Sequence, residues 1–170
     1  MEFLDVVKSR RSCRLYKNEP IDMDLLKKCI LLWMNAPSAR NEQPRKFFIL
    51  TDRERLDNLW NNLKFHKQML LSAPCAVCIA YDPKESSCLE YTFQSLSACA
   101  QTILLSLVNY WLWWCRLWTY PMQENCDLAK EMFNLPEWIE PFTILSIWVP
   151  DNSEILKEKI CEKEELIKIV

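Results

Sequence analysis

The sequence predicts a single α+β domain, and three observations support this prediction. The 170 residues suffice for one hydrophobic core, and no Pro-rich or Ser-rich linker divides them. Apolar runs of strand length recur along the chain, the plainest being residues 74–81, Pro-Cys-Ala-Val-Cys-Ile-Ala-Tyr. Amphipathic segments with helical spacing separate most of these runs. We therefore expect four or five strands in a mixed or antiparallel central sheet, flanked by helices.

Each element has a local signal. Strands are expected at residues 46–50, 74–81, 112–120 and 141–149, where β-branched and aromatic residues are bounded by prolines or polar turns. Helices are expected at residues 2–9, after a cap at Asp22 or Asp24, after the capping-box pattern Thr51-Asp52-Arg53-Glu54, at residues 89–110, and from Pro121 to about Phe133. Residues 66–71 suggest a further helical turn. The charged residues 151–170 are predicted to form an arm that packs on a partner subunit.

Composition excludes several classes of function. A net charge of −2 argues against general nucleic-acid binding and leaves the basic residues near the N-terminus as a local feature. The apolar stretch after residue 98 is interrupted by Gln101, Thr102, Ser106 and Asn109, which favours a buried helix over a membrane span. No secretory signal pattern opens the chain, so its nine cysteines are expected to be reduced thiols in the cytoplasm.

The sequence predicts no metal site and no side-chain acid–base machinery. Cys75 and Cys78 have the spacing of a metal or redox pair, but they lie in an apolar strand with no second pair. The single histidine, His66, has no carboxylate or cysteine pattern directed at it and is expected to be a surface or packing residue.

A basic segment near the N-terminus is the first candidate site. Arg10, Arg11 and Arg14 fall within five positions, with the hydroxyl of Ser12 between them. Guanidinium forks and a small hydroxyl donor suit a phosphate monoester. The alternative is a solvated basic turn after a helix.

A polar loop is the second candidate. Residues 37–44, Pro-Ser-Ala-Arg-Asn-Glu-Gln-Pro, are bounded by prolines and run into a predicted strand. Loops fixed to a rigid strand in this way often carry binding residues.

Together these motifs resemble the FMN-dependent nitroreductase family, over residues 2 to about 150. The similarity rests on Arg10-Arg11-Ser12-Cys13-Arg14, residues 36–44 running into a strand, Ala73-Pro74 before the next strand, Ala98-Cys99-Ala100-Gln101 on a long helix, and Tyr120-Pro121 after it. The resemblance implies a homodimer with FMN at the subunit interface. It implies that Arg10, Arg11, Ser12 and Arg14 hold the FMN phosphate and ribityl chain. It further implies that Pro37, Ser38 and Ala39 contact the isoalloxazine ring, with Asn41 and Gln43 at polar positions, and that Lys157 or Lys159 reaches the phosphate.

The implied activity is an NAD(P)H-dependent oxidoreductase that passes hydride through FMN to a nitroaromatic, a quinone or a similar electron-poor acceptor. The flavin carries the hydride, so the family chemistry requires no catalytic side chain. Two alternatives remain: a noncatalytic scaffold of the same fold that no longer binds flavin, and another flavin chemistry such as reductive dehalogenation.

The absence of glycine is the strongest departure from the family. The chain has eight tryptophans, and Trp33, Trp111, Trp113, Trp118 and Trp148 stand where the family tends to have glycine. Arg45 and Arg116 stand at its common tryptophan positions. We hypothesise that glycine was deliberately excluded, or that codons were reassigned or misread so that tryptophan appears for glycine. Indoles at Trp111 to Trp118 would either enter the flavin pocket or pack into the core or its rim.

Overall fold

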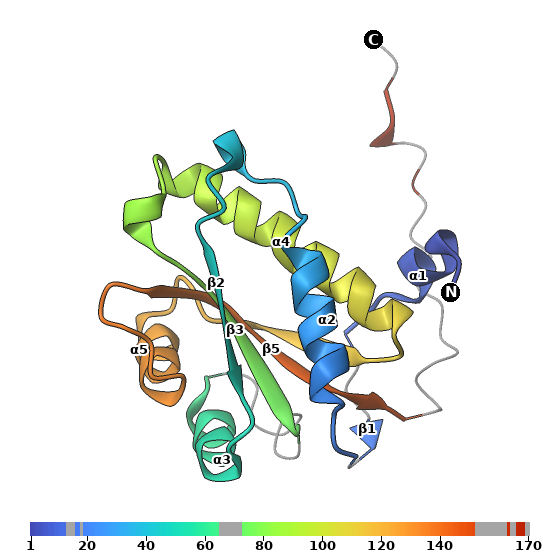
Figure 1. Cartoon of the computed structure of the whole chain (residues 1–170), viewed down its shortest axis with the longest axis horizontal. Helices are drawn as coiled ribbons and strands as arrows, with labels where there is room; N and C mark the ends of the chain where they lie inside the picture. The colour runs from blue at the N-terminus through green and yellow to red at the C-terminus, as the bar shows by residue number, and fades with distance from the viewer. Residues whose placement is uncertain (13–15, 18, 65–72, 152–162, 164–165, 169–170) are drawn as a thin grey trace.

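The computed structural model describes residues 1–12, 16–17, 19–64, 73–151, 163 and 166–168 (Figure 1). The elements are α1 (Phe3–Ser9), β1 (Tyr16–Lys17), α2 (Met23–Trp33), a 3-10 turn η1 (Ala39–Asn41), β2 (Arg45–Leu50), α3 (Arg53–Asn62), β3 (Cys75–Tyr81), a 3-10 turn η2 (Pro83–Glu85), α4 (Leu89–Asn109), β4 (Trp113–Trp118), α5 (Gln123–Met132) and β5 (Glu140–Pro150). The α+β prediction and the expected strands and helices are confirmed. The predicted turn at residues 66–71, His66 and nearly all of the predicted arm lie outside the described residues.

Among the described residues, the sheet has five strands, and every pairing between them is antiparallel. The path runs β1-β5-β3-β2, and β4 also pairs with β5. The long strand β5 therefore organises the sheet, with Ile144 opposite Cys78 of β3 and also opposite Leu117 of β4. The two-residue strand β1 was not predicted, because it exists only through its pairing with Val149 and Pro150.

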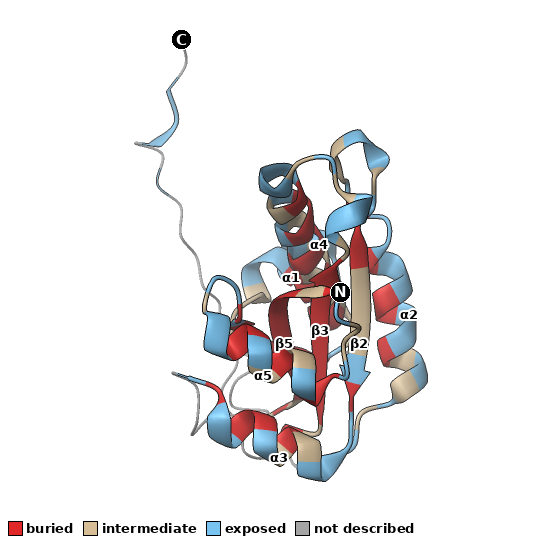
Figure 2. Ribbon diagram, turned by 90° about the vertical axis from the view of Figure 1, so that its left-hand side faces the viewer, coloured by how far each residue is buried: buried red, intermediate tan, exposed pale blue. Residues whose placement is uncertain are grey.

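Strict alternation along β3 divides the core into two layers. Ala76, Cys78 and Ala80 face a cluster covered by α3 and α5, whereas Cys75, Val77, Ile79 and Tyr81 face a cluster covered by α2 and α4. All seven strand residues are buried, as expected for a sheet covered on both faces. Figure 1 shows α2 and α4 crossing one face, and Figure 2 shows the buried strands between the helices.

Helix ends follow the predicted chemistry with one correction. Asp22 caps α2 by accepting from the amides of Asp24 and Leu25 at 2.9 and 3.1 Å. The capping box predicted at Thr51 is wrong by one residue, because Asp52 caps α3 and accepts from the Arg55 amide at 2.9 Å.

The C-terminal end of α4 is a turn in which Trp111 has a left-handed backbone, with φ of 60°. The Trp111 amide donates to Val108 O at 3.0 Å, and the Leu112 amide donates to Leu107 O at 2.9 Å. These two bonds form a Schellman motif, and its left-handed position usually carries glycine.

The other four tryptophans at expected glycine positions adopt no positive φ. Trp33, Trp113 and Trp148 are buried in the core, and Trp118 is exposed. Trp113 and Trp148 lie directly opposite each other on β4 and β5 and belong to the cluster beneath α3 and α5. The indoles of Trp33, Trp113 and Trp148 therefore pack as core residues. For Trp113, this is packing into the core and not entry into the flavin pocket.

The long helix α4 was predicted to be a core helix. It presents Leu96, Cys99, Ala100, Ile103 and Leu107 to the core with the spacing of a single helical face. Among the described residues, no helix combines the length and apolar character that a membrane crossing requires.

Candidate functional site

The basic segment follows directly from α1. Arg10 ends the helix, and its amide donates to Val6 O at 3.0 Å. Arg10, Arg11 and Ser12 are all half-buried. The helix is held beside the C-terminal end of α4, where the Met1 ammonium group donates to Asn109 Oδ1 at 3.2 Å. Arg14, Lys157 and Lys159 lie outside the described residues, so their predicted phosphate contacts stay predictions.

Two arginines of this segment lie against tryptophans at the start of β4. The Arg10 guanidinium carbon is 6.0 Å from the centre of the Trp114 ring, and that of Arg11 is 5.4 Å from the Trp113 ring. Cations at these distances are attracted by the negative face of an indole. Trp114 is itself fixed by its Nε1 donating to Leu104 O at 3.3 Å. The two guanidinium groups are thus placed by the end of α4 and the start of β4.

The polar loop, residues 37–44, has an unusual backbone. Arg40, Asn41 and Gln43 have φ of 51°, 57° and 50°. Asparagine tolerates this region, but an ordinary L-residue loses about 1–2 kcal/mol in the left-handed conformation. Such strain persists only where the surroundings enforce it, and it concentrates at functional sites.

Hydrogen bonds from inside and outside the loop enforce this conformation. The Gln43 amide donates to Ser38 Oγ at 3.1 Å, and Gln43 Nε2 donates to Asn41 Oδ1 at 2.7 Å. The Ala39 amide donates to Ser95 Oγ on α4 at 3.1 Å. Of the predicted loop residues, Pro37, Asn41 and Gln43 are exposed, and Ser38 and Ala39 are half-buried.

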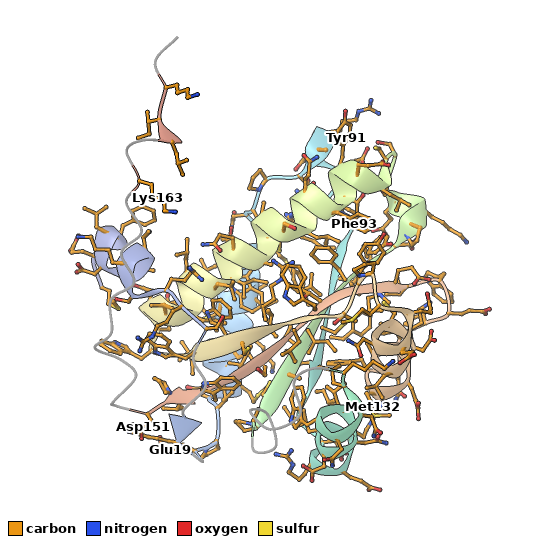
Figure 3. The ribbon with its side chains drawn as sticks, turned by 180° about the vertical axis from the view of Figure 1, so that it is seen from behind. Glu19, Tyr91, Phe93, Met132, Asp151 and Lys163 are labelled. Atoms are coloured by element: carbon orange, nitrogen blue, oxygen red, sulfur yellow. The ribbon has the colours of Figure 1, made fainter. Side chains whose placement is uncertain are left out.

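The loop and the basic segment lie at opposite ends of α4. Ser95 anchors the loop, whereas Asn109 contacts the N-terminus of α1. The fourteen helical steps from Ser95 to Asn109 correspond to about 21 Å at 1.5 Å per residue. Figure 3 shows Tyr91 and Phe93 near the N-terminal end of α4, far from α1 at its other end. The structure therefore does not bring the two predicted motifs together within one chain.

Comparisons with known proteins address both motifs. The profile described as the Nitroreductase family matches residues 7–64, a stretch that contains the basic segment and the loop. A protein of Archaeoglobus fulgidus, provisionally named NADH dehydrogenase/NAD(P)H nitroreductase, is 32% identical over 157 residues, covering 90% of this chain and 88% of its own length. The chain belongs to the nitroreductase family.

Solved structures agree with this family assignment. A crystal structure from Clostridium acetobutylicum, provisionally titled as an NADH oxidase, has a TM-score of 0.88 and 35% identity, covering 96% of this chain and 98% of its own. A crystal structure from Desulfovibrio desulfuricans, provisionally described as a nitroreductase and in complex with FMN, has a TM-score of 0.81 and covers 98% of this chain and 95% of its own. At 19% identity, this second likeness shows the fold alone.

The two arginines that the resemblance places at expected tryptophan positions each make specific contacts. Arg45 is buried, and its NH2 group donates to Met34 O beyond the end of α2 at 2.6 Å. The guanidinium carbon of Arg116 lies over the rings of Trp118 and Phe142, at 5.1 and 5.4 Å from their centres. Burial lowers the pKa of Arg116 because it penalises the charged form. Arg45 thus contacts a backbone carbonyl, whereas Arg116 stacks on aromatic rings.

Cys75 and Cys78 do not form a joint site. They lie on β3 and face opposite layers of the core. Burial raises the pKa of the Cys75 thiol to about 12 and raises that of Cys78 further. Their spacing reflects the alternation of a buried strand.

Sequence reasoning missed the residues outside the loop that hold it. Ser95 and Ser87 contact the loop but lie far from it in sequence, on α4 and just before it. Glu42 lies within the predicted loop, but no sequence pattern indicates a role for it. No sequence pattern pairs these residues, because α4 brings them together only after folding.

Proposed function

We propose that this chain is an FMN-dependent oxidoreductase that uses NAD(P)H to reduce a nitroaromatic, a quinone or a similar electron-poor acceptor. The observation that carries the proposal is membership of the nitroreductase family through a segment holding both candidate motifs. The name of the Archaeoglobus relative supports NAD(P)H as the electron donor, and membership of the family supports FMN as the cofactor. FMN, when bound, would accept hydride from the nicotinamide and pass it to the acceptor.

The donors in the basic segment fit the phosphate of FMN. Arg10 and Arg11 supply planar, permanently charged guanidinium groups, and Ser12 supplies a half-buried hydroxyl. Among the described residues, no ion pair engages the Arg10 guanidinium with a carboxylate, so its charge is available to a phosphate. We propose that Arg10, Arg11, Ser12 and Arg14 hold the phosphate end, with Lys157 or Lys159 added from the arm.

The polar loop fits the other end of the cofactor. We propose that Pro37, Ser38 and Ala39 contact the isoalloxazine ring, while Asn41 and Gln43 present polar groups to its edge. Because the loop and the basic segment lie at opposite ends of α4, each flavin would use the loop of one chain and the arginines of another. This arrangement requires a homodimer.

An apolar surface on α1 supports the dimer. Phe3, Leu4 and Val7 are 70%, 67% and 44% exposed, and Leu32 of α2 is 42% exposed beside the same end of α4. Apolar side chains gathered on one face are a common mark of a subunit interface.

One observation favours the noncatalytic alternative. Trp113, against which Arg11 lies, stands where the family resemblance leads us to expect glycine, and the neighbouring Trp114 contacts Arg10. A scaffold that folds and dimerises without flavin would follow if these indoles hold the arginines away from the phosphate. Other flavin chemistry, such as reductive dehalogenation, would share the same binding site.

The visible spectrum of the purified protein distinguishes the flavin enzymes from the noncatalytic scaffold. We expect flavin absorption after incubation with FMN and gel filtration, in a species with the mass of a dimer. Oxidation of NADH or NADPH should then depend on an added nitroaromatic or quinone. A colourless dimer that takes up no FMN would contradict the proposal and support the scaffold. Bound flavin without acceptor-dependent oxidation would favour a different flavin reaction.

A further inference from the structure

The loop at residues 37–44 is held in its left-handed backbone by contacts that the family resemblance does not name. The first is Ser95 on α4. Its Oγ accepts from the Ala39 amide at 3.1 Å and donates to Tyr91 O at 2.7 Å. Its hydroxyl proton is therefore committed to the helix, and a lone pair faces the loop. Ser95 is only 8% exposed, so water competes little for this bond.

The second contact joins the loop to the segment before α4. Ser87 Oγ donates to Glu42 Oε1 at 2.5 Å, and the Ser87 amide donates to Glu42 Oε2 at 3.2 Å. Both carboxylate oxygens are thus occupied by one residue, which fixes the direction of the Glu42 side chain. Arg40 NH1 adds a weaker bond to Ser87 Oγ at 3.4 Å.

These contacts bracket the strained residues. Ala39 precedes Arg40 and Asn41, and Glu42 follows them, so the chain is fixed on both sides of the two successive left-handed residues. Gln43 is fixed separately, because its backbone amide donates a hydrogen bond to Ser38 Oγ. Without the two outer contacts, the ordinary preference for negative φ would draw the loop into other conformations.

We propose that Ser95 and Ser87 are positioning residues, which preset the loop in the conformation that accepts the flavin ring. This inference rests on the proposed function. A loop that already has the binding conformation loses no conformational entropy when the ligand binds. If only a fraction of the molecules has that conformation, the apparent affinity falls by that fraction. The two serines would therefore act on flavin affinity without touching the flavin.

Amide hydrogen exchange and FMN titration of the full chain test this inference together. In Ser95→Ala we expect faster exchange at the Ala39 amide and an FMN dissociation constant raised by roughly three- to tenfold, the range of one lost hydrogen bond. Ser95→Thr keeps the hydroxyl and should restore both. Ser97→Ala, an exposed position on the same helix, is the matched control and should change neither. Ser87→Ala should weaken FMN binding in the same direction and free the Glu42 side chain.

The outcomes are distinguishable from failure of the proposed function. Unchanged Ala39 exchange in Ser95→Ala would overturn the inference, because the contact would not hold the loop. Faster exchange with wild-type FMN affinity would also overturn it, because the loop conformation would not govern flavin binding. If the wild-type chain itself takes up no FMN, the proposed function fails and the positioning role fails with it.

Discussion

The guanidinium carbon of Arg11 lies 5.4 Å from the centre of the Trp113 ring, and Trp113 in turn lies directly opposite Trp148 on β5. An arginine of the candidate phosphate segment is thus placed by an indole that belongs to the hydrophobic core. Arg10 has the same relationship to Trp114, whose ring belongs to the opposite core layer. The basic segment rests on both layers at the point where β4 begins.

Replacement of Arg10 should weaken FMN binding more than it weakens the fold. Arg10→Ala removes a charge-assisted contact of about 1.5–3 kcal/mol, so the FMN dissociation constant should rise roughly tenfold or more. Arg14→Ala should act similarly. Fluorescence titration of FMN measures the effect, and Lys27→Ala, a change of equal charge on the exposed side of α2, is the control. Equal FMN affinity in Arg10→Ala and in wild type would remove Arg10 from the phosphate site.

Replacement of Trp111 by glycine should be tolerated better than replacement of an equally exposed tryptophan. Trp111 is 53% exposed and has φ of 60°, so Trp111→Gly relieves backbone strain of about 1–2 kcal/mol, which offsets part of the loss of its half-buried indole. We therefore expect Trp111→Gly to melt roughly 2–8 °C above Trp138→Gly. Trp138→Gly is the matched control, since Trp138 is 57% exposed and has no positive φ. A thermal melt in which both variants shift alike would show that backbone strain is not the cause.

The intact mass of the expressed chain tests the origin of the tryptophans. If glycine was deliberately excluded, the mass should equal that of the printed sequence with eight tryptophans. Codons that are read as glycine would lower the mass by one indolylmethyl group for each affected site. Peptide mapping across residues 111–118 would then locate the changes, starting with Trp111, whose backbone already favours glycine.

The contact between Glu42 and Ser87 should depend on pH. The Ser87 hydroxyl and amide donate to the Glu42 carboxylate, and with the nearby Arg40 cation they hold its pKa below the usual value of 4.5. A lowered pKa means that the contact contributes fully above the usual value and is lost as pH falls through the lowered one. An NMR titration of the Glu42 carboxyl carbon should report this lowered pKa. In Ser87→Ala the pKa should move back up, and no difference between the two titrations would contradict the contact.

The buried cysteines should resist alkylation in the native state. With a pKa of about 12, the Cys75 thiol at pH 8 is ionised in roughly one molecule in ten thousand, and the thiolate is the reactive form. Cys88 is half-buried and lies in a loop, so it should react first among the seven described cysteines. Iodoacetamide labelling followed by peptide mass spectrometry measures the order. Early labelling of Cys75 or Cys78 would indicate that the sheet opens readily.

Local signals in the sequence were enough to predict most of the fold. The run from Cys75 to Tyr81 is apolar at every position, and only a strand covered on both faces suits that pattern. Two features were not predicted, because they depend on more than the local sequence pattern. Strand β1 depends on β5 at the far end of the chain, and the α3 cap moved from Thr51 to Asp52 because neighbouring residues compete for the same amides.

The candidate site was only partly predictable. The arginines and the loop are short, dense motifs, so their residue types alone suggested their chemistry. Their separation along α4 follows from packing and could not be deduced from spacing. The same holds for Ser95, whose hydroxyl is unremarkable on an α-helix until the folded chain places the Ala39 amide 3.1 Å away.

Helix α4 supports the loop near one end and the arginine segment near the other, which has a consequence for cooperativity. In the proposed homodimer, each flavin would engage the opposite ends of two such helices, and each helix would serve both flavins. Binding of FMN at one site would therefore act on α4 helices that also form part of the second site. The first and second FMN molecules should then bind with unequal affinity, and a calorimetric titration with two distinguishable steps would reveal it. A single hyperbolic isotherm would show that the helix transmits nothing between the sites.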